Sequence, residues 1–132
     1  MYERILVALK QDEGDDTLVE HASGLARLTG GCLILVHAIH SHSRDAGALL
    51  EERAEAYLAG HARRLAEAGV AVETMVARGG PAPAIRRAAQ QAGADLIVMG
   101  SHGHREVRHV LLGSVTETVI RGCDAPVLLV RP

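Results

Sequence analysis

The sequence predicts an α/β protein whose parallel sheet is covered by helices on both faces. Short apolar runs of strand length alternate along the chain with longer segments that have helical spacing. Such alternation implies right-handed crossovers between parallel strands. Apolar residues make up 48% of the chain and aromatic residues only 2%, so the core is built from Ala, Val, Leu and Ile. The length suits one compact domain, residues 1–132.

The first half of the chain predicts two strands and two helices. Residues 4–9 (RILVAL) form a continuous apolar run, as expected of a strand buried on both faces. After QDEGDD, apolar residues recur at helical spacing up to Leu28, and Gly30 and Gly31 end this first helix. Residues 32–39 (CLILVHAI) form the second strand, and a long helix covers residues 46–68.

The second half continues the alternation. Residues 70–77 predict the third strand, and the glycines and proline of GGP at 79–81 end it. The third helix begins around Pro83, because proline is tolerated in a first helical turn. Residues 95–99 predict the fourth strand, and residues 114–122 the fourth helix. Residues 127–130 (VLLV) predict the last strand.

Charge and composition exclude several classes of protein. The chain carries 14 basic and 16 acidic side chains, so it is not expected to bind nucleic acid or an anionic membrane in bulk. No run approaches the roughly 18 apolar residues that span a bilayer. The first residues, MYERILVALK, do not resemble a signal peptide, so we expect a cytoplasmic protein. Cys32 and Cys123 are then expected to be buried, unpaired and inert thiols.

The stretch MGSHGHREVRHVLLGSVTET, residues 99–118, carries the strongest functional signal. Gly100 and Gly103 follow the fourth strand, and glycines allow a nest of backbone N–H groups that suits an anion. Gly113 precedes a helix start, where free amides and the helix dipole favour negative charge. Basic and histidine side chains lie between them. This spacing is compatible with a phosphate site.

A structural interpretation of the same residues stays open. Ser114 and Glu117 match the S-x-x-E capping box, and Gly100 could simply end a strand. The loop is neither a Walker A sequence nor a G-x-G-x-x-G dinucleotide fingerprint. Spacing alone therefore leaves phosphate binding and turn formation as alternatives.

The spacing Gly100-x2-Gly103-x9-Gly113-Ser114 resembles the signature of the universal stress protein family, in its nucleotide-binding branch. The similarity extends to ILVAL, LILVHAI, ADLIVMGSHGH and GSVTETVIRGCDAPVLLVRP. The resemblance implies a Rossmann-like, five-stranded parallel sheet in the order 3-2-1-4-5. It also implies a homodimer that pairs through the last strand, Val127–Val130, and that acts on a protein partner the sequence does not identify.

The resemblance also implies a site for ATP or another adenine nucleotide, with Mg²⁺ carried by the phosphates. Residues that match the glycine signature and the following helix hold ribose and phosphates, and those that match Ala38 and Met99 lie near the base. The predicted nucleotide site comprises Ala8, Leu9, Lys10, Ala38, Met99, Gly100, His102, Gly103, His104, Arg105, Gly113, Ser114, Val115 and Thr116.

Lys10 departs from the family pattern, which usually has an aspartate at the end of the first strand. An ammonium group cannot accept hydrogen bonds from hydroxyls as a carboxylate does. Lys10 could turn towards phosphate, or Asp12 could supply the acceptor. The base pocket could also have lost selectivity, or the site could be empty.

Two clusters raise the possibility of a metal. Asp12, Asp15 and Asp16 could bind Mg²⁺, but acids also stabilise the start of a helix, and we favour that role. His40 and His42 could form a metal pair, although no third ligand completes a set. His37 is expected to have a structural role.

Three functions are compatible with these residues. The first is a nucleotide-binding regulatory module, and the second is a slow ATPase with His102 or His104 as base and Arg105 or Arg108 as charge stabiliser. The third is a nucleotide-free dimeric scaffold, which Lys10 favours. No catalytic residue is assigned, and hydrolysis is expected to be incidental at most.

Overall fold

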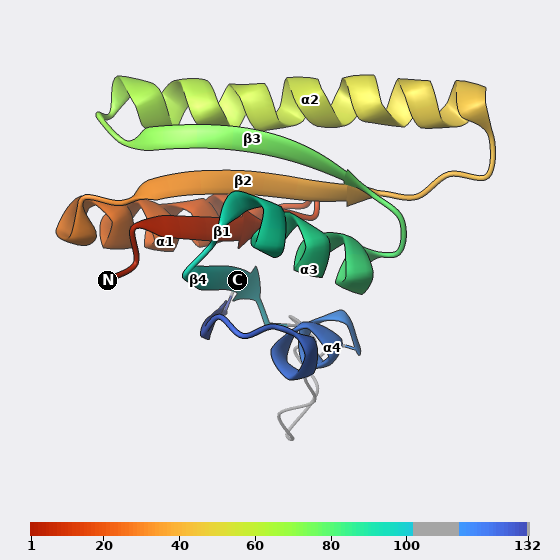
Figure 1. The fold of residues 1–132 in the computed structure, drawn as a ribbon. Coiled ribbons are helices and arrows are strands. Elements are labelled where there is room, and N and C mark those ends of the chain that lie inside the picture. Colours follow the sequence, from red (N-terminus) through yellow and green to blue (C-terminus); the bar gives the residue numbers. More distant parts are fainter. Residues whose placement is uncertain (102–113, 132) are drawn as a thin grey trace.

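The computed structural model describes residues 1–101 and 114–131. Its five strands form one parallel sheet in the order β3-β2-β1-β4-β5, which confirms the predicted order (Figure 1). The elements are β1 (Arg4–Ala8), α1 (Asp15–Thr29), β2 (Cys32–Ile39), α2 (Arg44–Glu67), β3 (Ala71–Arg78), α3 (Pro81–Ala92), β4 (Leu96–Gly100), α4 (Ser114–Gly122) and β5 (Val127–Val130).

The central strand, β1, pairs with β2 on one side and with β4 on the other. Val7 pairs with Leu35 and with Val98, so three apolar runs lie side by side in register. Helices cover both faces of these strands, and this explains why the runs are continuous rather than alternating. The central strand is buried from Ile5 onwards in consequence, and Ile5, Leu6 and Val7 have no exposed surface.

Two apolar cores separate the sheet from its helices. One core joins the sheet to α1 and α2 through side chains such as Leu18 and Leu58. The other joins it to α3 and α4 through side chains such as Ile85 and Val119. Because no Phe or Trp is available, β-branched residues, leucine and alanine fill both layers. The predicted coverage of both faces is confirmed.

Element boundaries differ from the prediction by a few residues. Helix α2 begins at Arg44, because the Ser43 side chain caps it by accepting from the Ala46 N–H at 3.1 Å. Helix α3 begins at Pro81 rather than Pro83. Gly80 takes the cap position and Pro81 the first turn, where a missing N–H costs no hydrogen bond.

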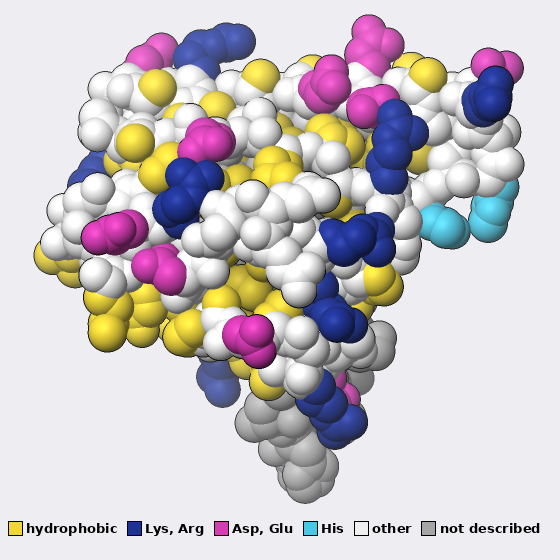
Figure 2. Space-filling model, in the orientation of Figure 1, with side chains coloured by type: hydrophobic (Ala, Val, Ile, Leu, Met, Phe, Trp, Pro, Cys, Tyr) yellow, Lys and Arg dark blue, Asp and Glu magenta, His cyan; other side chains and the backbone are white. Residues whose placement is uncertain are grey.

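The surface in view mixes both signs of charge (Figure 2). No helix in the described ranges is long and apolar enough to cross a bilayer. Cys32 and Cys123 are free, as predicted, but they are partly rather than fully buried. Burial raises the pKa of both thiols, which keeps them protonated.

Candidate functional site

The carboxyl ends of all five parallel strands lie at one edge of the sheet. From β1 the chain winds to β2 and β3 on one side, and it later returns to β4 and β5 on the other. Ligands of open α/β sheets bind at this edge, where the winding reverses. The crevice is therefore expected between the ends of β1 and β4. Gly100, the first glycine of the signature, is the last residue of β4.

The predicted site residues divide into buried and accessible groups. The side chains of Ala8, Leu9 and Met99 belong to the cores, with Met99 only 2% exposed. Thr116 is also buried, on the first turn of α4. Lys10 is exposed, whereas Ala38, Gly100 and Val115 are half-buried. His102, Gly103, His104, Arg105 and Gly113 lie outside the described residues, as do Arg108 and the side chain of Ser114.

The turn after β1 is organised by one buried carboxylate. Asp15, the first residue of α1, is 2% exposed. Its Oδ1 accepts the Lys10 N–H at 3.0 Å, and its Oδ2 accepts the Gln11 N–H at 2.8 Å. Gln11 has a φ of 60°, which is uncommon for a residue with a side chain. The two charge-assisted bonds stabilise this conformation.

The backbone before the turn is fixed from the opposite side. The Leu9 N–H donates to the Val36 carbonyl at 2.8 Å, which extends the β1–β2 pairing by one residue. The Leu9 carbonyl accepts from Nδ1 of His37 at 2.7 Å. This contact places the ring proton on Nδ1. His37 therefore has the structural role that its position predicted.

Sequence reasoning missed the residue that ties this turn to α2. The hydroxyl of Tyr57 donates to Oδ2 of Asp15 at 2.6 Å, across 42 positions of the sequence. Burial, and then the hydrogen bond to Asp15, raises the pKa of the Tyr57 hydroxyl. It is therefore a donor throughout the neutral range. Tyr57 and His61 are one helical turn apart in the sequence, a spacing that indicates two polar side chains on one face of α2 that require partners. The spacing does not identify Asp15 as the partner.

His61 stays uncharged next to this network. Its ring contacts the Tyr57 ring edge to face, with the two ring centroids 4.9 Å apart. Its Nδ1 accepts a hydrogen bond from Nη2 of Arg64 at 3.0 Å. The side chain is 4% exposed. Burial, and then the charge of Arg64, lowers the pKa of His61 below its ordinary value. The neutral imidazole is the form that accepts from Arg64.

We expect His61 to make the protein less stable in mild acid. The unfolded chain protonates His61 as the pH falls through 6.5, whereas the folded protein resists until the pH reaches its lower pKa. The free energy of unfolding therefore falls across that window, and His61→Gln should flatten the fall. Urea unfolding at several pH values measures it, with the exposed His21→Gln as control. Parallel profiles for the wild type and His61→Gln would contradict this assignment.

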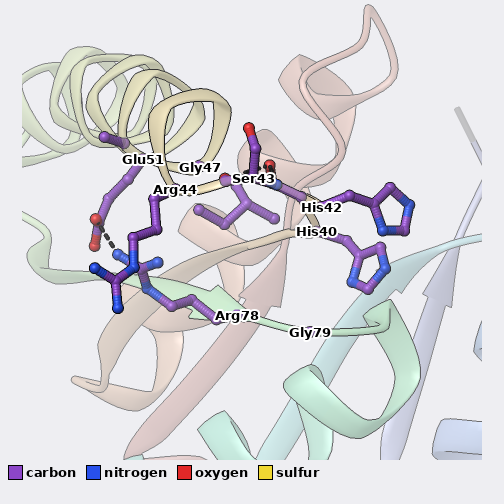
Figure 3. A pocket seen from close by; sticks show the side chains of 11 residues that line it. His40, His42, Ser43, Arg44, Gly47, Glu51, Arg78 and Gly79 are labelled. Atoms are coloured by element: carbon purple, nitrogen blue, oxygen red, sulfur yellow. Dashed lines mark hydrogen bonds and ion pairs between the residues drawn. The ribbon is translucent and has the colours of Figure 1, made fainter.

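A hollow of about 530 Å³ opens at the same sheet edge but beside β2 and β3 (Figure 3). Figure 3 shows Arg44 and Arg78 extending towards Glu51, while the imidazoles of His40 and His42 lie together on the opposite side. Arg78 forms an ion pair with Glu51. This hollow adjoins the end of β2, the strand that contains Ala38. It does not lie between β1 and β4, where the winding of the sheet reverses. We therefore place the candidate site by topology rather than by this hollow.

Within the ranges that the structure describes, neither metal alternative gains a complete set of ligands. His40 and His42 meet edge to face with ring centroids 5.2 Å apart. Among the described residues, no group of three or more His, Cys, Asp or Glu side chains could hold an ion. Asp15 binds backbone amides, and Oδ1 of Asp12 accepts the Gly14 N–H at 3.0 Å. Both carboxylates thus act at the start of α1.

Comparison with known proteins assigns the family. The architecture is that of a doubly wound parallel α/β protein whose winding reverses between β1 and β4. A family model, Universal stress protein family, matches residues 1–131. The chain belongs to the universal stress protein family.

Similar proteins agree over nearly the whole length. Universal stress protein MJ0577 of Methanocaldococcus jannaschii is 29% identical, over 99% of this chain and 96% of the relative. Universal stress protein A homolog 2 of Coxiella burnetii is 32% identical, over 98% of this chain and 95% of the relative. The solved structure of MJ0577 matches with a TM-score of 0.85 at 30% identity, covering 100% of this chain and 97% of that one.

A further solved structure has a ligand in its description. It is a universal stress protein in complex with cAMP, with a TM-score of 0.80 at 27% identity. The match covers 98% of this chain and 97% of that chain.

Proposed function

We propose that this protein binds an adenine nucleotide at the carboxyl edge of the sheet, between the ends of β1 and β4. The observation that carries the proposal is the position of Gly100, the first residue of the glycine signature, at the end of β4 beside the central strand. Ser114, the last residue of the signature, begins α4. Phosphates are stabilised at such helix starts. A similar protein in complex with cAMP supports the ligand class.

Lys10 gives the site a cation at the end of the central strand. Its side chain is exposed, and no carboxylate of the described residues pairs with its ammonium group. Asp15, the nearest buried acid in the sequence, already binds two backbone amides and a hydroxyl. Lys10 therefore turns to the nucleotide's phosphates, together with any Mg²⁺ that they carry. Asp12 keeps one carboxylate oxygen for the sugar.

The protein acts as a regulatory module rather than as an enzyme. Nucleotide binding changes the surface that a protein partner contacts. Hydrolysis of the nucleotide is incidental. A homodimer through β5 belongs to this proposal, because β5 is an edge strand and Leu128 on it is 39% exposed. The nucleotide-free scaffold is the second candidate, and the observation that favours it is Lys10 in place of the family's aspartate.

Nucleotide binding should depend on the Ser114 hydroxyl. We expect freshly purified protein to release ATP or another adenine nucleotide on denaturation, detected by mass spectrometry. The stripped protein should bind ATP in calorimetry, and Ser114→Ala should weaken binding about tenfold, the value of one hydrogen bond to a charged group. Ser43→Ala is the matched control, because Ser43 caps α2. It should cost only about 1 kcal/mol of stability.

The opposite result would favour the scaffold. If stripped protein shows no saturable binding of ATP, ADP, AMP or cAMP, the nucleotide proposal is wrong. The nucleotide-free scaffold then becomes the better account of the same fold.

A further inference from the structure

The β1–α1 turn and helix α2 share one carboxylate. Both oxygens of Asp15 accept backbone amides of the turn, and Oδ2 also accepts the Tyr57 hydroxyl from α2. Asp15 is almost fully buried, so these bonds form away from water, where charged hydrogen bonds are strong. Tyr57 is half-buried and its ring packs against the α1–α2 core. A contact in the middle of a long helix thus reaches the rim of the sheet's carboxyl edge.

The same turn holds the backbone from which the Lys10 side chain extends. Its own N–H and that of Gln11 are bound to Asp15, and the preceding carbonyl, that of Leu9, is bound to His37. The backbone on either side of Lys10 is therefore fixed. The side chain itself is exposed and makes no hydrogen bond or ion pair within the described residues. The held backbone limits the region that the flexible Lys10 side chain can reach, so a change in the turn would move its ammonium group.

We infer that Tyr57 is a positioning residue of the nucleotide site, which acts through Asp15 to hold the turn that presents Lys10 to the ligand's phosphates. The inference rests on the proposed nucleotide site. Tyr57 does not touch the ligand. Its hydroxyl fixes the rotamer of the Asp15 carboxylate, because Oδ2 must face both α2 and the Gln11 amide. Without the hydroxyl, the carboxylate and the turn gain alternative conformations, and the backbone that carries Lys10 is no longer held in one position.

The competing account is that Tyr57 only packs α1 against α2. A packing residue would change the stability of the protein but not the affinity of the folded protein for nucleotide. A positioning residue would change the affinity, and only while Lys10 is present to be positioned. A double-mutant cycle between residues 57 and 10 separates the two accounts.

The test uses Tyr57→Phe, Lys10→Ala and their combination in the full chain, with calorimetric titration of ATP into stripped protein. We expect Tyr57→Phe to raise the Kd roughly fivefold, within the range of coupled hydrogen-bond networks. Lys10→Ala should raise it about tenfold, as for the loss of a charged contact. In the Lys10→Ala background, Tyr57→Phe should add less than about a twofold change. Lys10→Arg keeps the cation, so the effect of Tyr57→Phe should persist there.

The matched control is Tyr2→Phe. Tyr2 is the other tyrosine of the chain, it also packs against the α1–α2 core, and its hydroxyl makes no hydrogen bond within the described ranges. This variant should bind ATP as the wild type does. Circular dichroism at the titration temperature confirms that each variant is folded.

The outcomes separate the two proposals. If the wild type binds ATP and Tyr57→Phe binds it equally well, Tyr57 is a packing residue and the inference is wrong, while the proposed function stands. Equal losses from Tyr57→Phe with and without Lys10 overturn it in the same way, because the effect then does not pass through Lys10. If the wild type binds no nucleotide, the proposed function fails, and the inference fails with it.

Discussion

Replacing Asp15 by alanine should destabilise the protein by about 3 kcal/mol, because three donors lose their acceptor at once. The amides of Lys10 and Gln11 and the hydroxyl of Tyr57 all bind this carboxylate. Asp15 itself is 2% exposed, so water replaces its oxygens only in part. Gln11 would also keep an unfavourable positive φ without the bond that stabilises it. Urea unfolding followed by circular dichroism gives the change in the free energy of unfolding.

Asp16→Ala is the matched control for Asp15→Ala. Asp16 is the next residue, lies in the same first turn of α1 and carries the same charge, but it is exposed. Its loss removes only a favourable interaction with the helix dipole, about 0.5 kcal/mol. Equal losses of stability in the two variants would show that Asp15 stabilises the protein through its charge at the helix start, and not through its hydrogen bonds to the turn and to Tyr57.

The order of strands and helices could be predicted because each element has its own pattern in the sequence. Strands buried on both faces are continuous apolar runs, and the β1 run agrees with the prediction to within one residue. Glycines mark the ends of helices, as at Gly30, which has a φ of 72°. The start of α3 differs from the prediction, since PAP offers two prolines and each is compatible with a first turn.

The candidate site could be predicted only where it is local in sequence. The glycine signature lies within one stretch of the chain, so its spacing is visible without a structure. The bond between Asp15 and Tyr57 joins residues 42 positions apart, and it depends on how α2 packs beside α1. The sequence shows that Asp15 lies at a helix start, but nothing in the sequence identifies which hydroxyl meets it. The sequence therefore predicts a role for Asp15 at the helix start alone and no role for Tyr57.

The hydrogen bonds of Asp15 to the β1–α1 turn also bear on Lys10, the clearest departure from the family pattern. The sequence leaves open whether the lysine faces phosphate or leaves the site empty. The structure adds that its backbone is held on both sides while its ammonium has no acidic partner among the described residues. An unpaired cation at a sheet's ligand edge favours an anionic ligand. The unpaired Lys10 thus supports the nucleotide proposal independently of the glycine signature.

Gly31→Ala should be as damaging as the loss of Asp15, at about 3 kcal/mol, because the chain passes too close for a side chain. A Cβ at Gly31 would overlap the carbonyl oxygen of Tyr2 and lie 3.2 Å from that of Glu3. Neither carbonyl can retreat cheaply. The Tyr2 carbonyl accepts from the Thr29 hydroxyl at 3.0 Å, and the Glu3 carbonyl accepts from the Cys32 N–H at 2.8 Å. Relieving the overlap therefore disturbs the start of the β1–β2 pairing.

Gly24→Ala should have the opposite effect and is the control for Gly31→Ala. Gly24 lies in the middle of α1 at an exposed position, and a Cβ there meets no atom within 4 Å. Alanine loses less backbone entropy than glycine in a helix, so stability should rise by about 0.5 to 1 kcal/mol. The two variants add the same methyl group within one short segment, and urea unfolding compares them directly. If both changed stability by a similar amount, the close approach of Gly31 to the amino-terminal carbonyls would not be what requires glycine there.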